Sequence, residues 1–149
     1  TEIYTLSLHD ALPISHLAIM TALKKGATDI YILGATGTRM DHTITNIGNM
    51  KVAADCGKDC HIVDEHNYIY LLSEADGIHI IRKDSQYGRY VSIIPMSENV
   101  SLSLEGFKYT LDNYELKQGL SICQSNEVED EQGIIKVHKG LIIVLETKD

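Results

Sequence analysis

The stretch ILGATGTRMDHTITNI, from Ile32 to Ile47, decides how the first part of the chain is expected to fold. The residues DIYILG, which begin at Asp29 and end at Gly34, form a short apolar run that is typical of a buried strand. After the glycines we expect Asp41 to cap a helix that ends at Gly57. One side of this helix carries Ile44, Ile47 and Met50. A strand, a glycine turn and a helix in this order indicate an α/β domain.

The residues on either side of this stretch follow different patterns. Residues 16–25 repeat apolar side chains at near-helical spacing and are followed by Gly26, a residue type that commonly ends helices. CHIVD, at residues 60–64, resembles a second short strand. Beyond about Glu65, turn residues separate short β-type runs, which are YIYLL, GIHIIR, YVSIIPM, VSLSL, LSICQS, GIIKVH and LIIVLE. We therefore predict an α/β segment followed by an all-β segment, an antiparallel sandwich or barrel, with the boundary near residues 64–67.

The composition limits the possible partners. The chain has 149 residues and a hydrophobic content of 44%, which is enough to bury a core. A formal net charge of -8 argues against a nucleic-acid partner, because such affinity comes mainly from clustered Lys and Arg. The apolar runs are far shorter than the roughly 20 residues that span a bilayer, so we expect no membrane helix. We expect a soluble, cytoplasmic protein in which Cys56, Cys60 and Cys123 are buried or idle thiols.

The first fourteen residues, TEIYTLSLHDALPI, match the translation of a common short-read sequencing adapter in one reading frame. The next base of that adapter begins a serine codon, so the origin of Ser15 is open as well. We therefore interpret residues 1–15 as non-native and exclude them from the fold. On this interpretation the natural sequence starts near His16, its upstream part is absent, and the chain is the C-terminal part of a longer protein.

The turn GATG ahead of the expected helix could bind an anion. A strand that ends in glycines before a helix presents free backbone N–H groups and a partial positive charge, and phosphate is the usual ligand. The signal is weak by itself, because neither GxxxxGK[ST] nor a complete GxGxxG is present. Arg39 strengthens it, since a guanidinium can bind phosphate oxygens in a bidentate manner, although a surface cation is an equal alternative.

Asp41 and His42 leave alternatives open. A carboxylate beside a phosphate is repulsive unless it binds a metal, orients a hydroxyl group or caps the helix, and capping is an equal alternative. His42 could be a base, a hydrogen-bond donor to phosphate or a packed core histidine, and its spacing favours packing. The residues alone therefore indicate a phosphate-binding edge of an α/β sheet.

At these residues the sequence resembles the thiamine pyrophosphokinase family, whose hallmark reads much like GATGGRLDHxxxNI. The matching residues here are Gly34 to His42, followed by Asn46 and Ile47. Further matching blocks are SIIPMSENVSLSLEGFKYTLDN at 92–113, SNE at 125–127 and GLIIVLETKD at 140–149. The resemblance covers essentially His16 to Asp149.

The resemblance implies both a fold and an activity. Residues 16–65 would be the C-terminal part of a truncated Rossmann-like, parallel-sheet domain that binds nucleotide. Residues 66–149 would be a C-terminal antiparallel β-sandwich that binds thiamine. The enzymes of the family act as homodimers and, with Mg²⁺, transfer a pyrophosphoryl group from ATP to the thiamine hydroxyl, which gives thiamine diphosphate and AMP.

The resemblance also implies roles for single residues. The residues expected to bind ATP are Thr36, Gly37, Arg39 and Asn46. The residues expected to be catalytic are Asp41, Arg39 and His42. Asp41 would hold magnesium or the thiamine hydroxyl, and Asn46 could equally just bond the backbone. Ser125 and Asn126 would receive the thiamine ring, and their alternative is an ordinary hairpin.

Two departures from the family pattern qualify this interpretation. Thr38 stands where the family has a second glycine, so this position must tolerate a β-branched side chain. The family's upstream acidic motifs, of the GDxDS and DxTD type, are not found, and we therefore expect no turnover from this chain alone. The alternatives are pyrophosphoryl transfer to another alcohol, such as a pterin, and a non-catalytic module that binds thiamine or a partner.

Overall fold

The computed structural model describes residues 14–149, so the interpretation of residues 1–13 as adapter-derived lies outside the described residues. The chain is mostly β, with few helices and two sheets among the described residues. It divides into two compact units. The first ends at Glu65 and takes in Ile69–Leu71, and the second consists of His66–Tyr68 and Leu72–Asp149.

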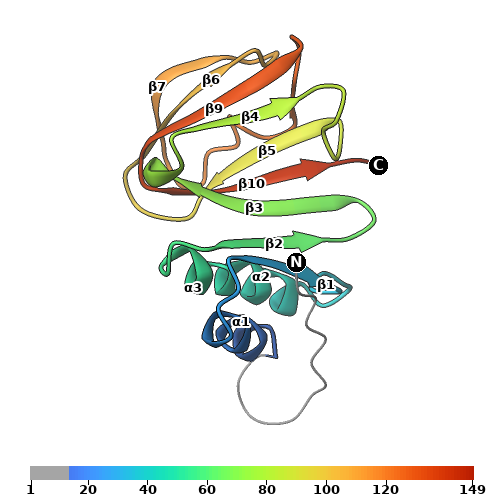
Figure 1. Cartoon of the computed structure of the whole chain (residues 1–149). Helices are drawn as coiled ribbons and strands as arrows, with labels where there is room; N and C mark the ends of the chain where they lie inside the picture. Colours follow the sequence, from blue (N-terminus) through green and yellow to red (C-terminus); the bar gives the residue numbers. More distant parts are fainter. Residues whose placement is uncertain (1–13) are drawn as a thin grey trace. The chain divides into compact units, whose positions relative to one another are not determined.

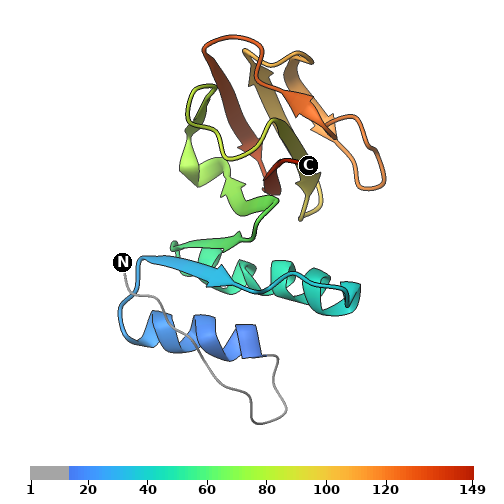
Figure 2. The ribbon, with the colours of Figure 1, turned by 90° about the vertical axis from the view of Figure 1, so that its right-hand side faces the viewer.

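The first unit pairs two parallel strands with helices. Its described elements are α1 (Ile14–Lys24), β1 (Asp29–Leu33), α2 (Met40–Asn49), α3 (Lys51–Ala54) and β2 (Asp59–Val63). β1 and β2 pair in parallel, with Leu33 opposite Val63, so the predicted strands are confirmed. Ile30, Cys60 and Ile62 are buried, and Figures 1 and 2 show the helices on one side of the two strands. Apolar side chains at alternate positions therefore pack this strand pair against the helices.

The helix after the turn differs from the prediction at both ends. Arg39, with φ −87° and ψ 100°, is the N-cap of α2, and Asp41 is the second helical residue. The prediction that Asp41 caps the helix is therefore wrong, because the backbone of Arg39 already has the extended conformation of a cap. The chain also does not continue as one helix to Gly57, since α2 ends at Asn49 and α3 follows at Lys51–Ala54.

The apolar side predicted for this helix is only partly buried. Met50, directly after α2, is fully buried, whereas Ile44 is 64% exposed. No residue within α2 itself is buried. The helix therefore lies at the surface of the first unit, and its N-terminal half is open to solvent.

The second unit is formed by antiparallel strands, as predicted (Figure 1). The remaining elements are β3 (Asn67–Ser73), η1 (Glu74–Asp76), β4 (Ile78–Arg82), β5 (Tyr90–Pro95), β6 (Val100–Glu105), β7 (Leu111–Leu116), β8 (Asn126–Glu127), β9 (Gln132–Lys139) and β10 (Leu141–Thr147). One sheet has the order β4-β9-β6-β7, and in the other β5 lies between β10 and β8. No helix of the described chain is long and apolar enough to span a bilayer.

One predicted strand is wrong. The run LSICQS, at residues 120–125, forms turns, and only the next two residues make the short strand β8. Ser125 has a φ of 53°, which lies outside the β region and stops a strand from forming there. The carbonyl oxygen of Cys123 instead accepts a hydrogen bond from the N–H of Ile93 at 2.9 Å.

The register of three neighbouring strands brings two polar side chains into the interior of the second unit. Glu146 of β10 lies opposite Val91 of β5, and Val91 lies opposite Asn126 of β8. The three residues are 5%, 1% and 3% exposed, in that order. A buried carboxylate and a buried amide need polar partners, and both have them.

Candidate functional site

The turn after β1 lies at the carboxyl edge of the two parallel strands. Gly34 has a φ of 74°, a left-handed conformation that favours glycine, and it turns the chain out of the strand. The hydroxyl of Thr36 donates a hydrogen bond to Oδ2 of Asp64, which directly follows β2, at 2.5 Å. In open α/β sheets, ligands bind beyond this edge. The turn is therefore ordered by the neighbouring strand at a position suited to ligand binding.

Asn46 fastens the same turn to α2. Its Nδ2 donates a hydrogen bond to the carbonyl oxygen of Ala35 at 2.6 Å. Its Oδ1 accepts a hydrogen bond from the hydroxyl of Ser15, also at 2.6 Å, and this hydroxyl accepts another from Asn49 at 2.9 Å. The side chain of Asn46 thus bonds the backbone, which is the alternative that the sequence left open.

Arg39 and Asp41 form an ion pair at the start of α2. Nη2 of Arg39 lies 2.5 Å from Oδ2 of Asp41, and Nε donates to Oδ1 at 3.2 Å. The side chains are 68% and 63% exposed, so the pair adds little to stability. The hydrogen bond from Arg39 lowers the pKa of Asp41 below its ordinary value. Asp41 is therefore an exposed, ionised carboxylate beside a cation that a phosphate could also bind.

Three further residues of this segment are exposed: Gly37, Thr38 and His42. The exposure of Thr38 explains how its β-branched side chain is accommodated. The exposure of His42 shows that the preference for a packed core histidine was wrong, because α2 has no buried face at this point. His42 is thus open to solvent in the turn of helix that carries Asp41.

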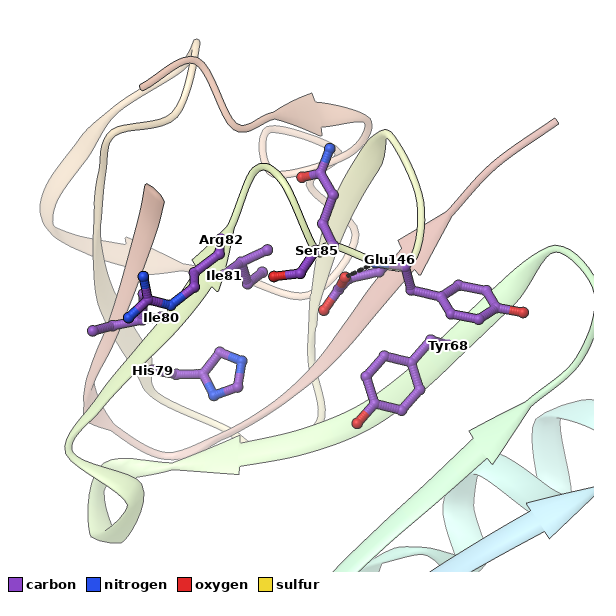
Figure 3. Close-up of a pocket in the computed structure, with 9 residues that line it drawn as sticks. Tyr68, His79, Ile80, Ile81, Arg82, Ser85 and Glu146 are labelled. Carbon is purple, nitrogen blue, oxygen red and sulfur yellow. Dashed lines mark hydrogen bonds between the residues drawn. The ribbon is translucent and has the colours of Figure 1, made fainter. Parts of the chain in front are cut away.

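A pocket of about 280 Å³ in the second unit was not predicted (Figure 3). It is lined by Tyr68, His79, Ile80, Ile81, Arg82, Ser85, Gln86, Tyr87 and Glu146. The buried carboxylate of Glu146 accepts a hydrogen bond from the N–H of Tyr87 at 2.8 Å. The rings of Tyr68 and Tyr87 are 5.8 Å apart, and Nζ of Lys148 lies 4.4 Å from the centroid of the Tyr87 ring. Aromatic rings beside a carboxylate suit a small, planar or amine-bearing molecule.

Ser125 and Asn126 have different surroundings. Ser125 is exposed, and its N–H donates to Oγ of Ser92 at 2.9 Å. The amide of Asn126 is buried, with Oδ1 accepting from the N–H of Tyr109 at 3.0 Å and Nδ2 donating to its carbonyl oxygen at 2.8 Å. Asn126 therefore fastens a neighbouring loop, and only Ser125 presents its side chain to solvent.

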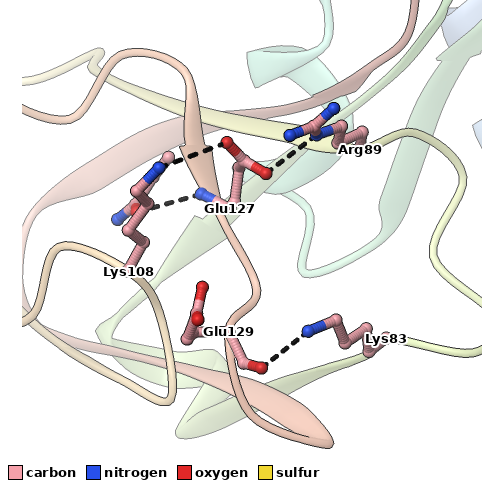
Figure 4. A network of polar contacts seen from close by, with 6 residues as sticks. Lys83, Arg89, Lys108, Glu127 and Glu129 are labelled. Carbon is pink, nitrogen blue, oxygen red and sulfur yellow. Dashed lines mark hydrogen bonds and ion pairs between the residues drawn. The ribbon is translucent and has the colours of Figure 1, made fainter.

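Glu127 is the centre of a group of charges next to these residues (Figure 4). Its Oε2 accepts a hydrogen bond from Nε of Arg89 at 2.8 Å, and its Oε1 lies 3.8 Å from Nζ of Lys108. The hydrogen bond from Arg89 is the largest cause that lowers the pKa of Glu127. Lys83 donates to the carbonyl oxygen of Glu129 at 2.6 Å. These contacts tie the SNE segment to the loop before β5.

Comparison with known proteins points to one family. Residues 78–142 match the family described as "Thiamin pyrophosphokinase, vitamin B1 binding domain". The chain is 35% identical over 134 residues to the thiamine pyrophosphokinase of Bacillus subtilis (strain 168), which covers 89% of the chain and 61% of the relative. The resemblance to thiamine pyrophosphokinase is confirmed.

Solved thiamine pyrophosphokinases share the fold of the chain. The crystal structure from Bacillus subtilis matches with a TM-score of 0.82 at 35% identity, over 89% of the chain and 61% of that structure. The crystal structure from Geobacillus thermodenitrificans matches with a TM-score of 0.78 at 31% identity, over 89% of the chain and 60% of that structure. The chain thus spans only part of the length of the thiamine pyrophosphokinases that it matches.

The resemblance to thiamine pyrophosphokinase gave roles to several residues, and the structure brings one group of them together. The residues on the turn after β1 and on α2 are Thr36, Gly37, Arg39, Asp41, His42 and Asn46. Ser125 and Asn126 belong to the second unit.

Sequence interpretation missed Asp64 and Glu146. The signals were an acid directly after the second parallel strand and an acid in the inward-facing series of the run LIIVLE.

The three cysteine thiols belong neither to the group of site residues on the turn and α2 nor to the site residues of the second unit. Burial raises the pKa of Cys60 to about 12 and that of Cys123 to about 11, whereas Cys56 is exposed. Among residues 14–149, no three His, Cys, Asp or Glu side chains lie close enough together to hold a metal ion. The thiols of Cys60 and Cys123 are therefore protonated and unreactive near neutral pH.

Proposed function

We propose that the protein to which this chain belongs transfers the pyrophosphoryl group of ATP to the hydroxyl of thiamine, which gives thiamine diphosphate and AMP. The observation that carries the proposal is the ordered GATG turn at the carboxyl edge of a parallel strand pair, in a chain that is 35% identical to a thiamine pyrophosphokinase. The match of residues 78–142 to a vitamin B1 binding domain supports thiamine as the second substrate.

The proposed architecture has a domain for each substrate. Residues 16–65 are the C-terminal part of a Rossmann-like, nucleotide-binding domain, and the parallel pairing of β1 and β2 supports this. Residues 66–149 are an antiparallel β-sandwich that binds thiamine, which the alternating burial along β10 supports. Ile14 and Ser15, although assigned to the non-native segment, are part of α1, and Ser15 bonds Asn46 of the first domain.

ATP binding is proposed for the turn and the start of α2. The backbone N–H groups of Thr36 and Gly37 and the guanidinium of Arg39 bind the phosphates, because all are donors near a helix N-terminus. Arg39 binds Asp41 in the structure, so a phosphate competes with this carboxylate for the guanidinium. Asn46 stabilises the turn by donating a hydrogen bond to the carbonyl oxygen of Ala35.

The chemistry requires an in-line displacement at the β-phosphorus. The thiamine hydroxyl oxygen forms a bond to this phosphorus, the bond to the oxygen shared with the α-phosphate breaks, and AMP leaves with that oxygen. Asp41 orients the hydroxyl, whose proton passes to Asp41 or to His42. Asp41 also fits Mg²⁺, which binds one or two carboxylates and completes its shell with water and phosphate oxygens. The ion would supply positive charge to the phosphates.

Thiamine binding is proposed for the second unit. Ser125 contacts the thiamine ring directly, since its side chain is exposed in a turn that is fixed by Ser92. Asn126 holds that turn in shape through Tyr109. We further propose a homodimer, as the resemblance implies, and a cytoplasmic location, because the few, irregularly spaced cysteines fit a reducing compartment.

Calorimetry tests the proposal with two separate titrations, one with ATP and Mg²⁺ and one with thiamine. Binding of both substrates supports pyrophosphoryl transfer to thiamine. Binding of ATP with a pterin in place of thiamine would favour the alternative acceptor, and binding of thiamine without ATP would favour a non-catalytic module. A chain that binds neither would contradict the proposal.

A further inference from the structure

Asp64 connects the two parallel strands beyond their carboxyl ends. Since Leu33 of β1 lies opposite Val63 of β2, the residues that follow each strand leave the sheet at one edge. There the hydroxyl of Thr36 donates a hydrogen bond to Oδ2 of Asp64, and this bond is partly buried. The turn after β1 and the segment after β2 are thus joined by a side-chain contact.

The turn is held from two sides. Asn46 binds the carbonyl oxygen of Ala35 on the side of α2, and Asp64 binds the hydroxyl of Thr36 on the side of the sheet. Backbone N–H groups bind a phosphate best when their directions are fixed before the ligand arrives. We propose that Asp64 is a positioning residue that fixes Thr36, and with it the N–H groups of the turn, for the ATP phosphates. This role rests on the proposed function of the turn.

The hydrogen bond also defines what Thr36 can offer to a ligand. A threonine hydroxyl has a single hydrogen, and in this structure that hydrogen is donated to Asp64. A phosphate therefore binds the backbone N–H of Thr36. The side chain of Thr36 orients this N–H through its hydrogen bond to Asp64. Thr36 and Asp64 act together through this hydrogen bond, and removal of either partner abolishes it.

Charge and hydrogen bonding make opposite contributions at Asp64. A carboxylate near a polyphosphate is repulsive, whereas an oxygen that accepts from Thr36 orders the turn. Asn at position 64 keeps an acceptor oxygen and removes the charge. If the role is positioning, Asp64→Asn keeps the turn partly ordered, whereas Asp64→Ala loses this order.

Backbone NMR relaxation and ATP affinity test the proposal in the full chain. Asp64→Ala and Thr36→Val should each lower the backbone order parameters of residues 35–38. Because a hydrogen bond to a charged group contributes about 1.5–3 kcal/mol, each variant should also weaken ATP binding by about tenfold or more, and the double variant should lose less than the two single losses combined. Asp64→Asn keeps a weaker, uncharged acceptor, so its order parameters should lie between those of the wild type and of Asp64→Ala, whereas the control Asp59→Ala, an exposed acid at the other end of β2, should behave like the wild type.

The outcomes separate this proposal from the proposed function. Wild-type order parameters in both Asp64→Ala and Thr36→Val would overturn it, as would an Asp64→Asn variant whose turn is as mobile as that of Asp64→Ala. Unchanged order parameters in α1 show that the first unit remains folded in each variant. If ATP causes no change at the turn of the wild type, the proposed function fails, and the order parameters of the variants still decide whether Asp64 orders the turn.

Discussion

Asn46 of α2 donates a hydrogen bond to the carbonyl oxygen of Ala35 at 2.6 Å, which joins the helix to the turn that precedes it. Ala35 is buried, so this carbonyl has little access to water. Oδ1 of the same Asn46 amide accepts a hydrogen bond from the hydroxyl of Ser15. One side chain thus links α1, the turn and α2.

Replacement of Asn46 by Ala should lower the stability of the first unit by about 1–3 kcal/mol, because it leaves the carbonyl of Ala35 and the hydroxyl of Ser15 without this partner. Denaturant unfolding measures the loss. Asn49→Ala is the matched control, since it changes the same residue type on the same helix and removes only the bond to Ser15. Equal losses in the two variants would contradict the role given to Asn46.

The ion pair between Arg39 and Asp41 should have a measurable pH signature. The folded pKa of Asp41 is lowered, so its contribution to stability is present above the unfolded pKa of about 3.9 and is lost as the pH falls through the folded pKa. Arg39→Ala should raise the pKa of Asp41 toward its ordinary value in an NMR titration. High salt should weaken the effect, because both groups are exposed. An unchanged titration in Arg39→Ala would show that the pair does not persist in solution.

Asn126 and Ser125 should respond differently to replacement by Ala. Asn126→Ala removes two part-buried hydrogen bonds, to the N–H and the carbonyl of Tyr109, and should cost about 1–2 kcal/mol of stability. Ser125→Ala should change stability by less than about 0.5 kcal/mol and should weaken thiamine binding. Thermal unfolding and calorimetry with thiamine measure the two effects. An unchanged affinity for thiamine in Ser125→Ala would contradict the proposal that Ser125 contacts the thiamine ring.

The three thiols should react at different rates with a disulfide reagent. Cys56 is exposed and should react in the native state. Cys60 and Cys123 are buried with raised pKa values, so they should react only when the protein opens. The time course of thiol labelling with and without denaturant measures this. Rapid native labelling at Cys60 would mean that β2 is not packed against the helices.

Much of the fold could be predicted because its elements have local signals. The run DIYIL and the glycine turn identified β1, and the alternating runs after Glu65 identified antiparallel strands. LSICQS was misjudged because its composition is typical of a strand, whereas Ser125 has a positive φ and its N–H donates a hydrogen bond to the side chain of Ser92 in β5. Short apolar runs carry no information about such tertiary bonds.

The candidate site was predictable only where it is continuous in sequence. The residues from Thr36 to Asn46 lie within a short segment, so a motif found them. Asp64 is 28 positions from Thr36 and is brought close only by the register of β1 and β2. Glu146 enters the pocket through its register with β5. Neither pairing can be inferred from spacing along the chain.

The most direct measurement is the change in backbone amide NMR shifts when ATP with Mg²⁺ is added to the chain. The account predicts that the largest shifts occur at residues 34–39, with Thr36 and Gly37 foremost, and that Arg39→Ala reduces them. Shifts that are absent from this turn, or that lie only in the second unit, would contradict the claim that the turn binds the polyphosphate.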